Sequence, residues 1–361
     1  MDLSLLPDGG LRWLDASGTG SSMVLSNRIR LARNLAANRF GRRAPTSERE
    51  SILATVTKAA ASTESLGHAV TLRVDTLGTQ DRLVLLERHL ISKELAALEG
   101  SASGPEGGAL LLQDDAAVMV NEEDHLRLQV LGSGADFGPA WRQIQRVDAE
   151  LGQRLAFAFH PEFGYLTSCP TNAGTGLRAS VLIHLPGLVL TKEISKTLHG
   201  LTKLGLTYRG LYGEGSEVIG NFFQLSNQTT LGKNEVELLD QLSKIVQHVM
   251  AVESRARQLL LRDATTILED KVWRAFGLLR YARSLSFEET MNLLSGVRLG
   301  VSLGLIPDVG MYALNKLLVF TQPAHLAAMT GVELRDDELP VQRARFVRRV
   351  LEDEVGRNRS T

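Results

Sequence analysis

The sequence predicts an α+β domain followed by a small all-α domain, and three observations support this division. Short strand-like segments alternate with helical ones from residue 20 to about residue 233. Many strands with few long helices favour an α+β sheet over a regular βαβ alternation. After residue 234 the strand patterns cease and only helical periodicity continues. We therefore expect an α+β domain at 1–262 and a helical domain at 263–361.

Within the first domain, apolar and β-branched content marks the strands, and helical periodicity marks the segments between them. The expected strands are 23–30, 69–75, 109–113, 116–121, 125–131, 155–159, 177–185 and 206–209. The expected helices are 47–61, 80–89, 139–151 and 192–204. Gly and Ser residues between 101 and 108 predict a surface loop.

The C-terminal part opens with one long helical pattern. Residues 235–261 place Leu, Ile and Val at helical spacing over a length sufficient to cross a sheet. Ser286 and Glu289 have the spacing of a capping box, which marks a helix start. The shorter helices expected after the long one are 265–284, 286–303, 309–320 and 338–355.

The composition is that of an ordinary globular protein. Hydrophobic residues make up 43% of the chain and charged residues 22%, with a net charge of −1. This charge gives no electrostatic reason to expect binding to nucleic acid or to a membrane. A single cysteine excludes an internal disulfide framework and a Cys-rich zinc site. The N-terminus has no secretory signal pattern and no apolar run approaches membrane-spanning length, so we expect a cytoplasmic protein.

Arginines on or beside strands are the recurring signal of the first domain. Arg28 and Arg30 alternate, so a strand would point both side chains to one face. Extended geometry would likewise align Glu123, His125 and Arg127. Any one of these arginines alone could be a solvated surface residue. Convergence of five of them would be costly unless an anion met them, and a triphosphate fits their forked donors. The five arginines are Arg28, Arg30, Arg127, Arg178 and Arg209.

The only cysteine, Cys169, precedes a Gly-rich turn. Gly174 and Gly176 would let backbone amides approach a ligand closely. Two carboxylates, Glu123 and Glu214, lie within a few residues of these arginines. A kinase acting on a guanidinium must orient a planar cation and remove a proton, which two carboxylates can do. A Cys169 thiolate would add negative charge beside them.

The motifs of three other enzyme classes are absent or incomplete in this sequence. The chain has no P-loop sequence. Asp136-Phe-Gly138 matches the protein-kinase magnesium motif, but the catalytic-loop and lysine motifs are missing, and we interpret it as the lead-in to a helix. His160-Pro-Glu162 matches half of a zinc-deaminase motif without its paired cysteines.

Two long motifs resemble the signatures of the ATP:guanido phosphotransferases. They are Asn121-Glu-Glu-Asp-His-Leu-Arg127 and Cys169-Pro-Thr-Asn-Ala-Gly-Thr-Gly-Leu-Arg178. The segments 26–33, 87–92 and 209–217 are similar to those of the bacterial protein arginine kinases in that superfamily, and the likeness spans roughly residues 20–255. The order of domains also matches this branch, because the extra helices follow the core, whereas small-molecule guanidino kinases carry a helical domain before it.

The resemblance implies a core with an antiparallel sheet flanked by helices, and it assigns roles to single residues. Glu123 and Glu214 would hold and deprotonate the guanidinium, with Cys169 beside it. Magnesium would be held by phosphate oxygens and water, without a set of protein ligands. The implied ATP-binding residues are Ser26, Asn27, Arg28, Ile29, Arg30, His89, Arg127, Arg178, Ala179, Ser180, Val181, Leu182, Arg209, Gly210, Leu211, Tyr212, Gly213 and Glu214.

The leading hypothesis is therefore ATP-dependent phosphorylation of exposed arginines in proteins. By resemblance, the products are marked for an AAA+ unfoldase and protease during stress, a zinc-binding activator protein assists, a repressor is among the substrates, and the enzyme is a homodimer. A kinase for free arginine or another small guanidino metabolite is the second hypothesis. An inactive adaptor that binds arginine or phosphoarginine is the third.

One family motif is only partly present. Members carry Arg-Asp-x-x-Arg-Ala in the C-terminal domain, where it binds phosphoarginine. This chain keeps Arg343-Ala344 but has Leu339-Pro340 in place of Arg-Asp. Arg343, Arg345, Arg348 and Arg349 are then either the solvated face of a last helix, which we favour, or a binding patch.

Overall fold

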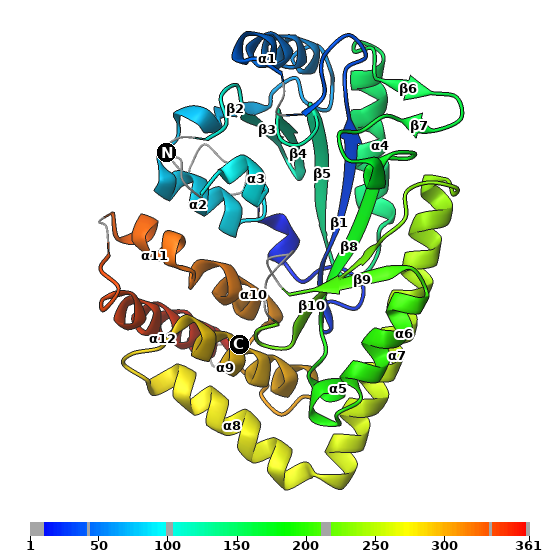
Figure 1. Cartoon of the computed structure of the whole chain (residues 1–361). Coiled ribbons are helices and arrows are strands. Elements are labelled where there is room, and N and C mark those ends of the chain that lie inside the picture. Colours follow the sequence, from blue (N-terminus) through cyan, green and yellow to red (C-terminus); the bar gives the residue numbers. More distant parts are fainter. Residues whose placement is uncertain (1–10, 42–43, 99–103, 211–217, 332–333, 359–361) are drawn as a thin grey trace.

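The centre of the molecule is an eight-stranded sheet in which every neighbouring pair of strands is antiparallel. The computed structural model describes residues 11–41, 44–98, 104–210, 218–331 and 334–358, and the strand order is β2-β3-β4-β5-β1-β8-β10-β9 (Figure 1). This confirms the expected α+β class with an antiparallel sheet. The strands are β1 (Val24–Arg33), β2 (Val70–Arg73), β3 (Ala109–Gln113), β4 (Ala116–Val120), β5 (Leu126–Ser133), β8 (Leu177–His184), β9 (Leu206–Arg209) and β10 (Phe222–Asn227).

Alternation along each strand gives the sheet two unlike faces. On β1, Ile29 and Leu31 enter the main hydrophobic core, while Arg28 and Arg30 point the other way. Helices cover the apolar face, and each fully buried aliphatic side chain contributes about 1.5–3 kcal/mol. The helices whose residues belong to this core are α1 (Thr46–Ala60), α4 (Gly138–Gly152), α5 (Pro186–Leu190), α6 (Ile194–Lys203) and α7 (Glu235–Asp263).

The opposite face is covered at its two ends. At one end, α2 (Thr79–Glu87) and α3 (Lys93–Ala96) pack on β3 and β4 through a separate apolar cluster that includes Leu85, Leu95 and Met119. At the other end, the C-terminal helices pack over Leu182 and Phe222 of the sheet. The middle of this face, around β1 and β8, is left for a cavity.

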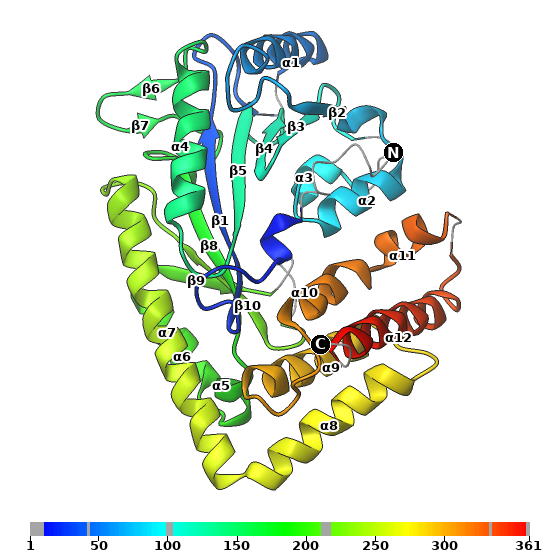
Figure 2. The same ribbon diagram turned by 180° about the vertical axis from the view of Figure 1, so that it is seen from behind.

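The C-terminal helices form their own core. Figure 2 shows them gathered below the sheet, with α7 running along the edge of the molecule to reach them. The hydroxyl of Ser286 accepts from the backbone N–H of Glu289, which caps the second of these helices as expected. The helices are α8 (Thr265–Tyr281), α9 (Phe287–Ser302), α10 (Met311–Phe320), α11 (Pro323–Thr330) and α12 (Leu339–Asn358).

Some expected elements differ from the structure. The strand expected at 155–159 is wrong, because only β6 (Phe159–His160) forms there, paired with β7 (Gly164–Tyr165) in a short hairpin. The apolar residues Leu155 and Ala158 are buried from a loop instead of a strand. Strand β10 and helices α3, α5 and α11 were not expected. The lead-in at Asp136 is confirmed, since α4 begins at Gly138.

The last helix corrects a further expectation. Arg343 is only 3% exposed, and it donates to the carbonyl oxygens of Thr321 and Leu285. It therefore ties α12 to neighbouring segments and does not belong to a solvated face. Over the part of the chain that the structure describes, no helix is long and apolar enough to cross a membrane.

Candidate active site

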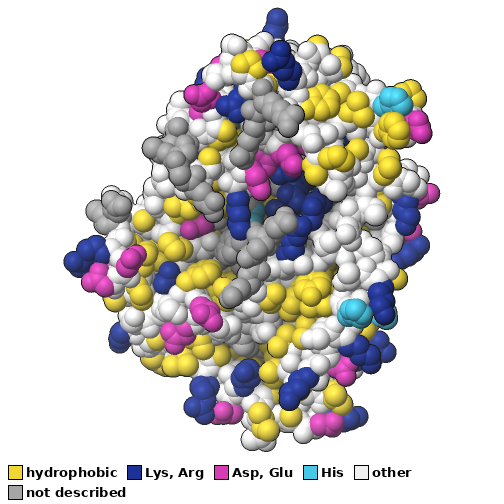
Figure 3. Space-filling model, in the orientation of Figure 1, with side chains coloured by type: hydrophobic (Ala, Val, Ile, Leu, Met, Phe, Trp, Pro, Cys, Tyr) yellow, Lys and Arg dark blue, Asp and Glu magenta, His cyan; other side chains and the backbone are white. Residues whose placement is uncertain are grey.

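A cavity of about 780 Å³ opens on the middle of the uncovered sheet face. Basic side chains gather in a hollow of this face, with acidic ones at its rim (Figure 3). Residues from β1, β5, β8, β9 and β10 form its floor, and the segments 89–94 and 168–176 form walls. The cavity therefore joins parts of the chain that lie far apart in the sequence.

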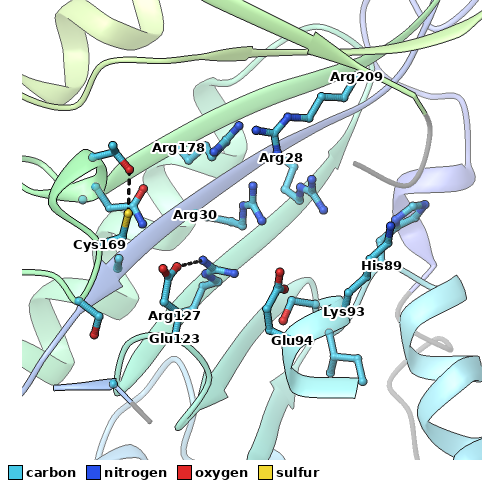
Figure 4. A pocket seen from close by; sticks show the side chains of 18 of the residues that line it. Arg28, Arg30, His89, Lys93, Glu94, Glu123, Arg127, Cys169, Arg178 and Arg209 are labelled. Atoms are coloured by element: carbon cyan, nitrogen blue, oxygen red, sulfur yellow. Dashed lines mark hydrogen bonds and ion pairs between the residues drawn. The ribbon is translucent and has the colours of Figure 1, made fainter. Parts of the chain in front are cut away.

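Strand register sets the arrangement of the basic residues. Arg30 on β1 lies opposite Arg178 on β8, and Arg28 lies opposite Ser180. Arg209 at the end of β9 lies opposite Gln224 of β10. These side chains extend from β1, β8 and β9, and Figure 4 shows Arg28, Arg30, Arg178 and Arg209 converging in the cavity. The predicted convergence of strand arginines thus has a direct structural basis.

The crowding of these arginines lowers their pKa values. Burial, followed by the charges of Arg178 and Arg127, lowers the pKa of Arg28 to about 10. The pKa of Arg30 lies well below its ordinary value, because of burial and then the charges of Arg28, Arg127 and Arg178, against which only Glu122 acts. A polyanion placed among them would relieve both the repulsion and the loss of hydration. The floor of the cavity is suited to a polyphosphate.

Two adjacent glutamates bind Arg127 from the turn between β4 and β5. Nη1 of Arg127 lies 2.5 Å from Oε1 of Glu122, whose side chain is fully buried. Nη2 lies 3.3 Å from Oε2 of Glu123, whose side chain is 40% exposed. Glu122 also accepts from the backbone N–H of Glu123. Glu122 thus fixes Arg127, while Glu123 keeps access to the cavity.

The pKa of the Glu123 carboxyl group is raised above its ordinary value. Burial is the largest effect and raises its pKa, the charge of Arg127 opposes that rise, and Asp124, Glu122 and Glu94 add to it. A carboxylate with a raised pKa accepts a proton more readily than an ordinary one. Glu123 is therefore equipped to act as a general base at the cavity wall.

Cys169 lies on the cavity wall formed by 168–176, just before the short helix η6 (Pro170–Asn172). Its Sγ is 3.0 Å from Oγ1 of Thr171. The loop that carries Cys169 is held in place by Thr230, whose hydroxyl group hydrogen-bonds to the carbonyl oxygens of Thr171 and Ala173. The thiol is thus held at the cavity by its own contact with Thr171 and by the bonds from Thr230 to the loop.

The glycine turn after Cys169 requires glycine for a spatial reason. Gly176 has φ +64°, and a Cβ there would lie 2.6 Å from the carbonyl oxygen of Ala32 on β1. The close approach of these backbones sets where β8 begins, and Arg178 is its second residue. Gly176 is therefore part of the mechanism that positions Arg178.

His89 enters the cavity from the end of α2. It has φ +59°, and its ring meets Trp13 edge-on at 5.8 Å between centroids. Burial and the charge of Arg28 lower its pKa to about 3. The imidazole is neutral at physiological pH and can donate or accept a hydrogen bond there without adding charge.

The structure brings some of the expected site residues to the cavity and places others elsewhere. Those that line the main cavity are Arg28, Arg30, His89, Glu123, Arg127, Cys169, Arg178 and Arg209. Those that line a small adjoining recess are Ser26, Ser180 and Leu182. The side chains of Ile29, Ala179 and Val181 lie in the hydrophobic core, and Asn27 donates instead to the carbonyl oxygen of Gly134. Gly210 is described but does not line the cavity, and Leu211, Tyr212, Gly213 and Glu214 lie outside the described residues.

One expected alignment is wrong. His125 does not share a face with Glu123 and Arg127, because 121–125 forms a turn in which Asn121 has φ +57°. Nδ1 of His125 accepts from the backbone N–H of Leu35, and the ring is buried away from the cavity. It shapes the turn and does not face the ligand.

Several residues at or near the cavity were not expected from the sequence, among them Glu122, Lys93, Glu94 and Gln224. Glu122 stands inside the quoted motif and could have been found beside Glu123. Lys93 and Glu94 follow the 87–92 segment directly. Gln224 could not be found, because its strand was not expected.

The donors available suit phosphate better than a bare metal ion. Among the described residues, no group of three or more His, Cys, Asp or Glu side chains could hold a metal. The cationic floor fits the oxygens of a triphosphate, which would carry magnesium with them.

Two family profiles cover most of the chain. "ATP:guanido phosphotransferase, C-terminal catalytic domain" matches residues 50–256, and "Protein-arginine kinase McsB C-terminal domain" matches residues 265–361.

Similar proteins point the same way. The chain is 45% identical over 342 residues to a protein-arginine kinase of Symbiobacterium thermophilum, covering 93% of this chain and 95% of that one. It is 42% identical to a protein-arginine kinase of Pelotomaculum thermopropionicum, covering 93% and 94%. A solved taurocyamine kinase of Schistosoma mansoni, a duplicated protein, matches with a TM-score of 0.57 at 24% identity, over 75% of this chain and 42% of that one. A lombricine kinase matches with a TM-score of 0.56 at 22% identity over 70% of each chain.

Proposed function

Because this chain belongs to the protein-arginine kinases of the ATP:guanido phosphotransferase family, we propose that its central cavity is where the γ-phosphoryl group of ATP passes to an arginine side chain. The enzyme transfers phosphate to arginine in proteins. The roles of single residues, given below, are our proposal. The observation that carries it is the convergence of five arginines with Glu123 and Cys169 around one cavity.

The arginine floor holds the triphosphate. Arg28, Arg30 and Arg178 offer fixed donors on adjacent strands, with Arg127 and Arg209 on either side. Fixed cations align the γ-phosphate and stabilise charge as it moves to the leaving oxygen. His89 contributes a neutral donor or acceptor at the end of the cavity near α2. A magnesium ion bound to the phosphate oxygens would neutralise further charge there.

The wall that carries Glu123 and Cys169 receives the acceptor. Glu123 pairs with one edge of the guanidinium and takes its proton as the new N–P bond forms. Glu214 is proposed as the second carboxylate, and Cys169 adds a polar contact beside it. Alignment supplies much of the acceleration, because the acceptor nitrogen must lie in line with the breaking P–O bond.

The broader assignments rest on the family likeness. We infer a division into a catalytic domain at 1–262 and a helical domain at 263–361, a cytoplasmic location and a homodimer. Stress-linked proteolysis through an AAA+ unfoldase, a repressor substrate and a zinc-binding activator are proposed on the same ground.

The direct test compares acceptors. The protein is incubated with magnesium and γ-labelled ATP, together with either an unfolded protein or free arginine, and the products are separated without acid. We expect acid-labile phosphate on the protein acceptor and little on free arginine. Glu214→Gln should abolish nearly all transfer while leaving nucleotide affinity largely intact.

Other outcomes would decide against parts of the proposal. Robust turnover of free arginine without protein labelling would favour the small-metabolite kinase. Absence of phosphate on every acceptor would favour an inactive adaptor. Equal loss of ATP binding in Glu214→Gln would show that Glu214 serves the nucleotide.

A further inference from the structure

A buried polar contact joins α2 of the sheet domain to α11 of the C-terminal helices. Glu87, the last residue of α2, is 7% exposed. Its Oε1 accepts from the backbone N–H of Ala324 at 2.9 Å, and its Oε2 accepts from the backbone N–H of His325 at 3.0 Å. The Nδ1 atom of His325 lies 2.7 Å from the same Oε2. Figures 1 and 2 both show α2 and α11 side by side.

Arg88 completes this contact and fixes the state of the histidine. Nε of Arg88 donates to Nε2 of His325 at 3.0 Å. Since Nε2 accepts, the single ring proton is on Nδ1 and is donated to Glu87. Burial is the main reason that the pKa of His325 lies below its ordinary value, despite Glu87. The three side chains therefore form one satisfied, neutral-imidazole network between the two domains.

The same helix end sets the position of His89. The N–H of His89 bonds to the carbonyl oxygen of Leu86 at 2.9 Å, and that of Leu90 bonds to Leu85 at 3.0 Å. This pattern ends a helix with one residue in the left-handed region, where glycine is usual. Here the residue is His89, with φ +59°. A non-glycine residue is strained there and persists only where its surroundings hold it.

Two contacts hold this conformation. Gln129 of β5 donates to the carbonyl oxygen of His89 at 2.8 Å, from the sheet side. From the other side, Glu87 and Arg88 anchor the preceding turn to α11. His89 thus directly follows Arg88, which bonds to His325 of the C-terminal helices, and it also lines the cavity.

We propose that Glu87 and His325 are positioning residues for nucleotide binding, through which the C-terminal helices hold the end of α2 and aim His89 into the cavity. The inference rests on the proposed nucleotide role of His89. It gives the C-terminal domain a part in the affinity of a site to which α8–α12 contribute none of the described lining residues.

The test uses the full chain and separates positioning from general stability. Glu87→Gln replaces one oxygen by an NH₂ group that faces backbone donors. His325→Leu removes the ring bonds, whereas His325→Asn keeps a donor for Glu87. Ser295→Ala is the matched control, because Ser295 of α9 also links the two domains, through His184 and Asn221, but does not touch α2. His89→Ala tests the premise.

We expect Glu87→Gln and His325→Leu to raise KM and Kd for ATP about tenfold with kcat changed much less. His325→Asn should stay near the parent values, and Ser295→Ala should lower the unfolding temperature without changing KM.

Two results would overturn the inference. If His89→Ala weakens ATP binding while Glu87→Gln and His325→Leu do not, the network is only a structural joint and the nucleotide role of His89 stands. If His89→Ala leaves ATP binding unchanged, both the inference and that part of the proposed function fail. Should His325→Leu not fold, the comparison of Glu87→Gln with His325→Asn still decides.

Discussion

Glu123 shows how one position in a turn can combine two demands. It must stay ionised enough to pair with Arg127 and yet be basic enough to take a proton. Burial raises its pKa and Arg127 limits the rise. The turn that carries it, closed by Asn121 at φ +57°, keeps its side chain partly exposed while the neighbouring Glu122 is buried.

We expect the rate to fall on the acidic side at a higher pH than an ordinary glutamate would give. Below its raised pKa, Glu123 is protonated and cannot act as the base. The measurement is kcat/KM as a function of pH. The rate is monitored through the release of ADP, because the phosphoarginine product is labile in acid. Glu123→Gln should lose most activity together with this limb. A limb that persists unchanged in the residual activity of the variant would assign it to another group.

Glu122 supports a second prediction at this scale. Glu122→Gln should raise KM for ATP about tenfold, because a charge-assisted bond to Arg127 is worth about 1.5–3 kcal/mol and its loss frees that arginine to move. Glu50→Gln is the control, since Glu50 pairs with Arg73 far from the cavity and both side chains are about 40% exposed. Equal KM values in the two variants would contradict the role of Glu122.

Local spacing predicts only part of the floor. Arg28 and Arg30 share one face because side chains alternate on any strand, whereas Arg178 reaches them only because β8 pairs with β1. His125 was misplaced because a turn replaced the expected extended segment. Gln224 was missed because nothing local marked its strand, which pairs with β8 across more than 35 positions of sequence.

At the scale of elements, the junction of β1 and β8 depends on a single glycine. Gly176→Ala would force a Cβ to within 2.6 Å of the Ala32 carbonyl oxygen and to within 2.7 Å of Nη1 of Arg33. We expect a loss of about 2 kcal/mol or more in the free energy of unfolding, together with weaker ATP binding, because Arg178 would shift.

A helical glycine provides the contrast. Gly277 lies inside α8, and apart from its chain neighbours and its own helix backbone no atom lies within 4 Å of the place of a Cβ. Gly277→Ala should therefore stabilise the protein by about 0.5–1 kcal/mol. Urea unfolding of both variants checks the pair. Similar changes in the two would show that space at Gly176 is not limiting.

The main helices were predictable at this scale, while the small connecting ones were not. Helix α7 has a sustained helical periodicity of apolar residues. Asn234 and Glu237 form a capping box, which marks the start of the helix at Glu235. Helix α11 has only eight residues, and its position depends on Glu87, 237 residues earlier in the chain than Ala324. No local pattern encodes such a contact.

At the scale of the whole molecule, buried imidazoles make the fold sensitive to acid. His184 of β8 is fully buried and bonds to Ser295 of α9 at 2.8 Å. Its pKa lies far below the ordinary value because of burial and then the charges of Arg298 and Arg257. The unfolded chain takes up this proton below about pH 6.5, whereas the folded protein does not. The contribution of His184 to the free energy of unfolding is therefore fully present above that pH and falls as the pH drops below it.

The expected slope is up to about 1.4 kcal/mol per pH unit from this group between pH 6 and pH 5. Chemical denaturation at several pH values measures it. His184→Asn should lower stability at pH 7.5 but reduce the slope, since the titrating group is gone. An unchanged slope would show that His89, His125 and His325, whose pKa values are also lowered, dominate the acid response.

The like-charged neighbours Arg30 and Arg178 have a consequence for the living cell. Placed opposite one another on adjacent strands, they repel in the ligand-free enzyme. Any polyphosphate that binds between them stabilises the folded state by mass action, about 2.7 kcal/mol at a concentration one hundred times its Kd. The lifetime of the folded kinase is thereby coupled to the energy charge of its surroundings. A fall in ATP would leave the enzyme less active and also easier to unfold.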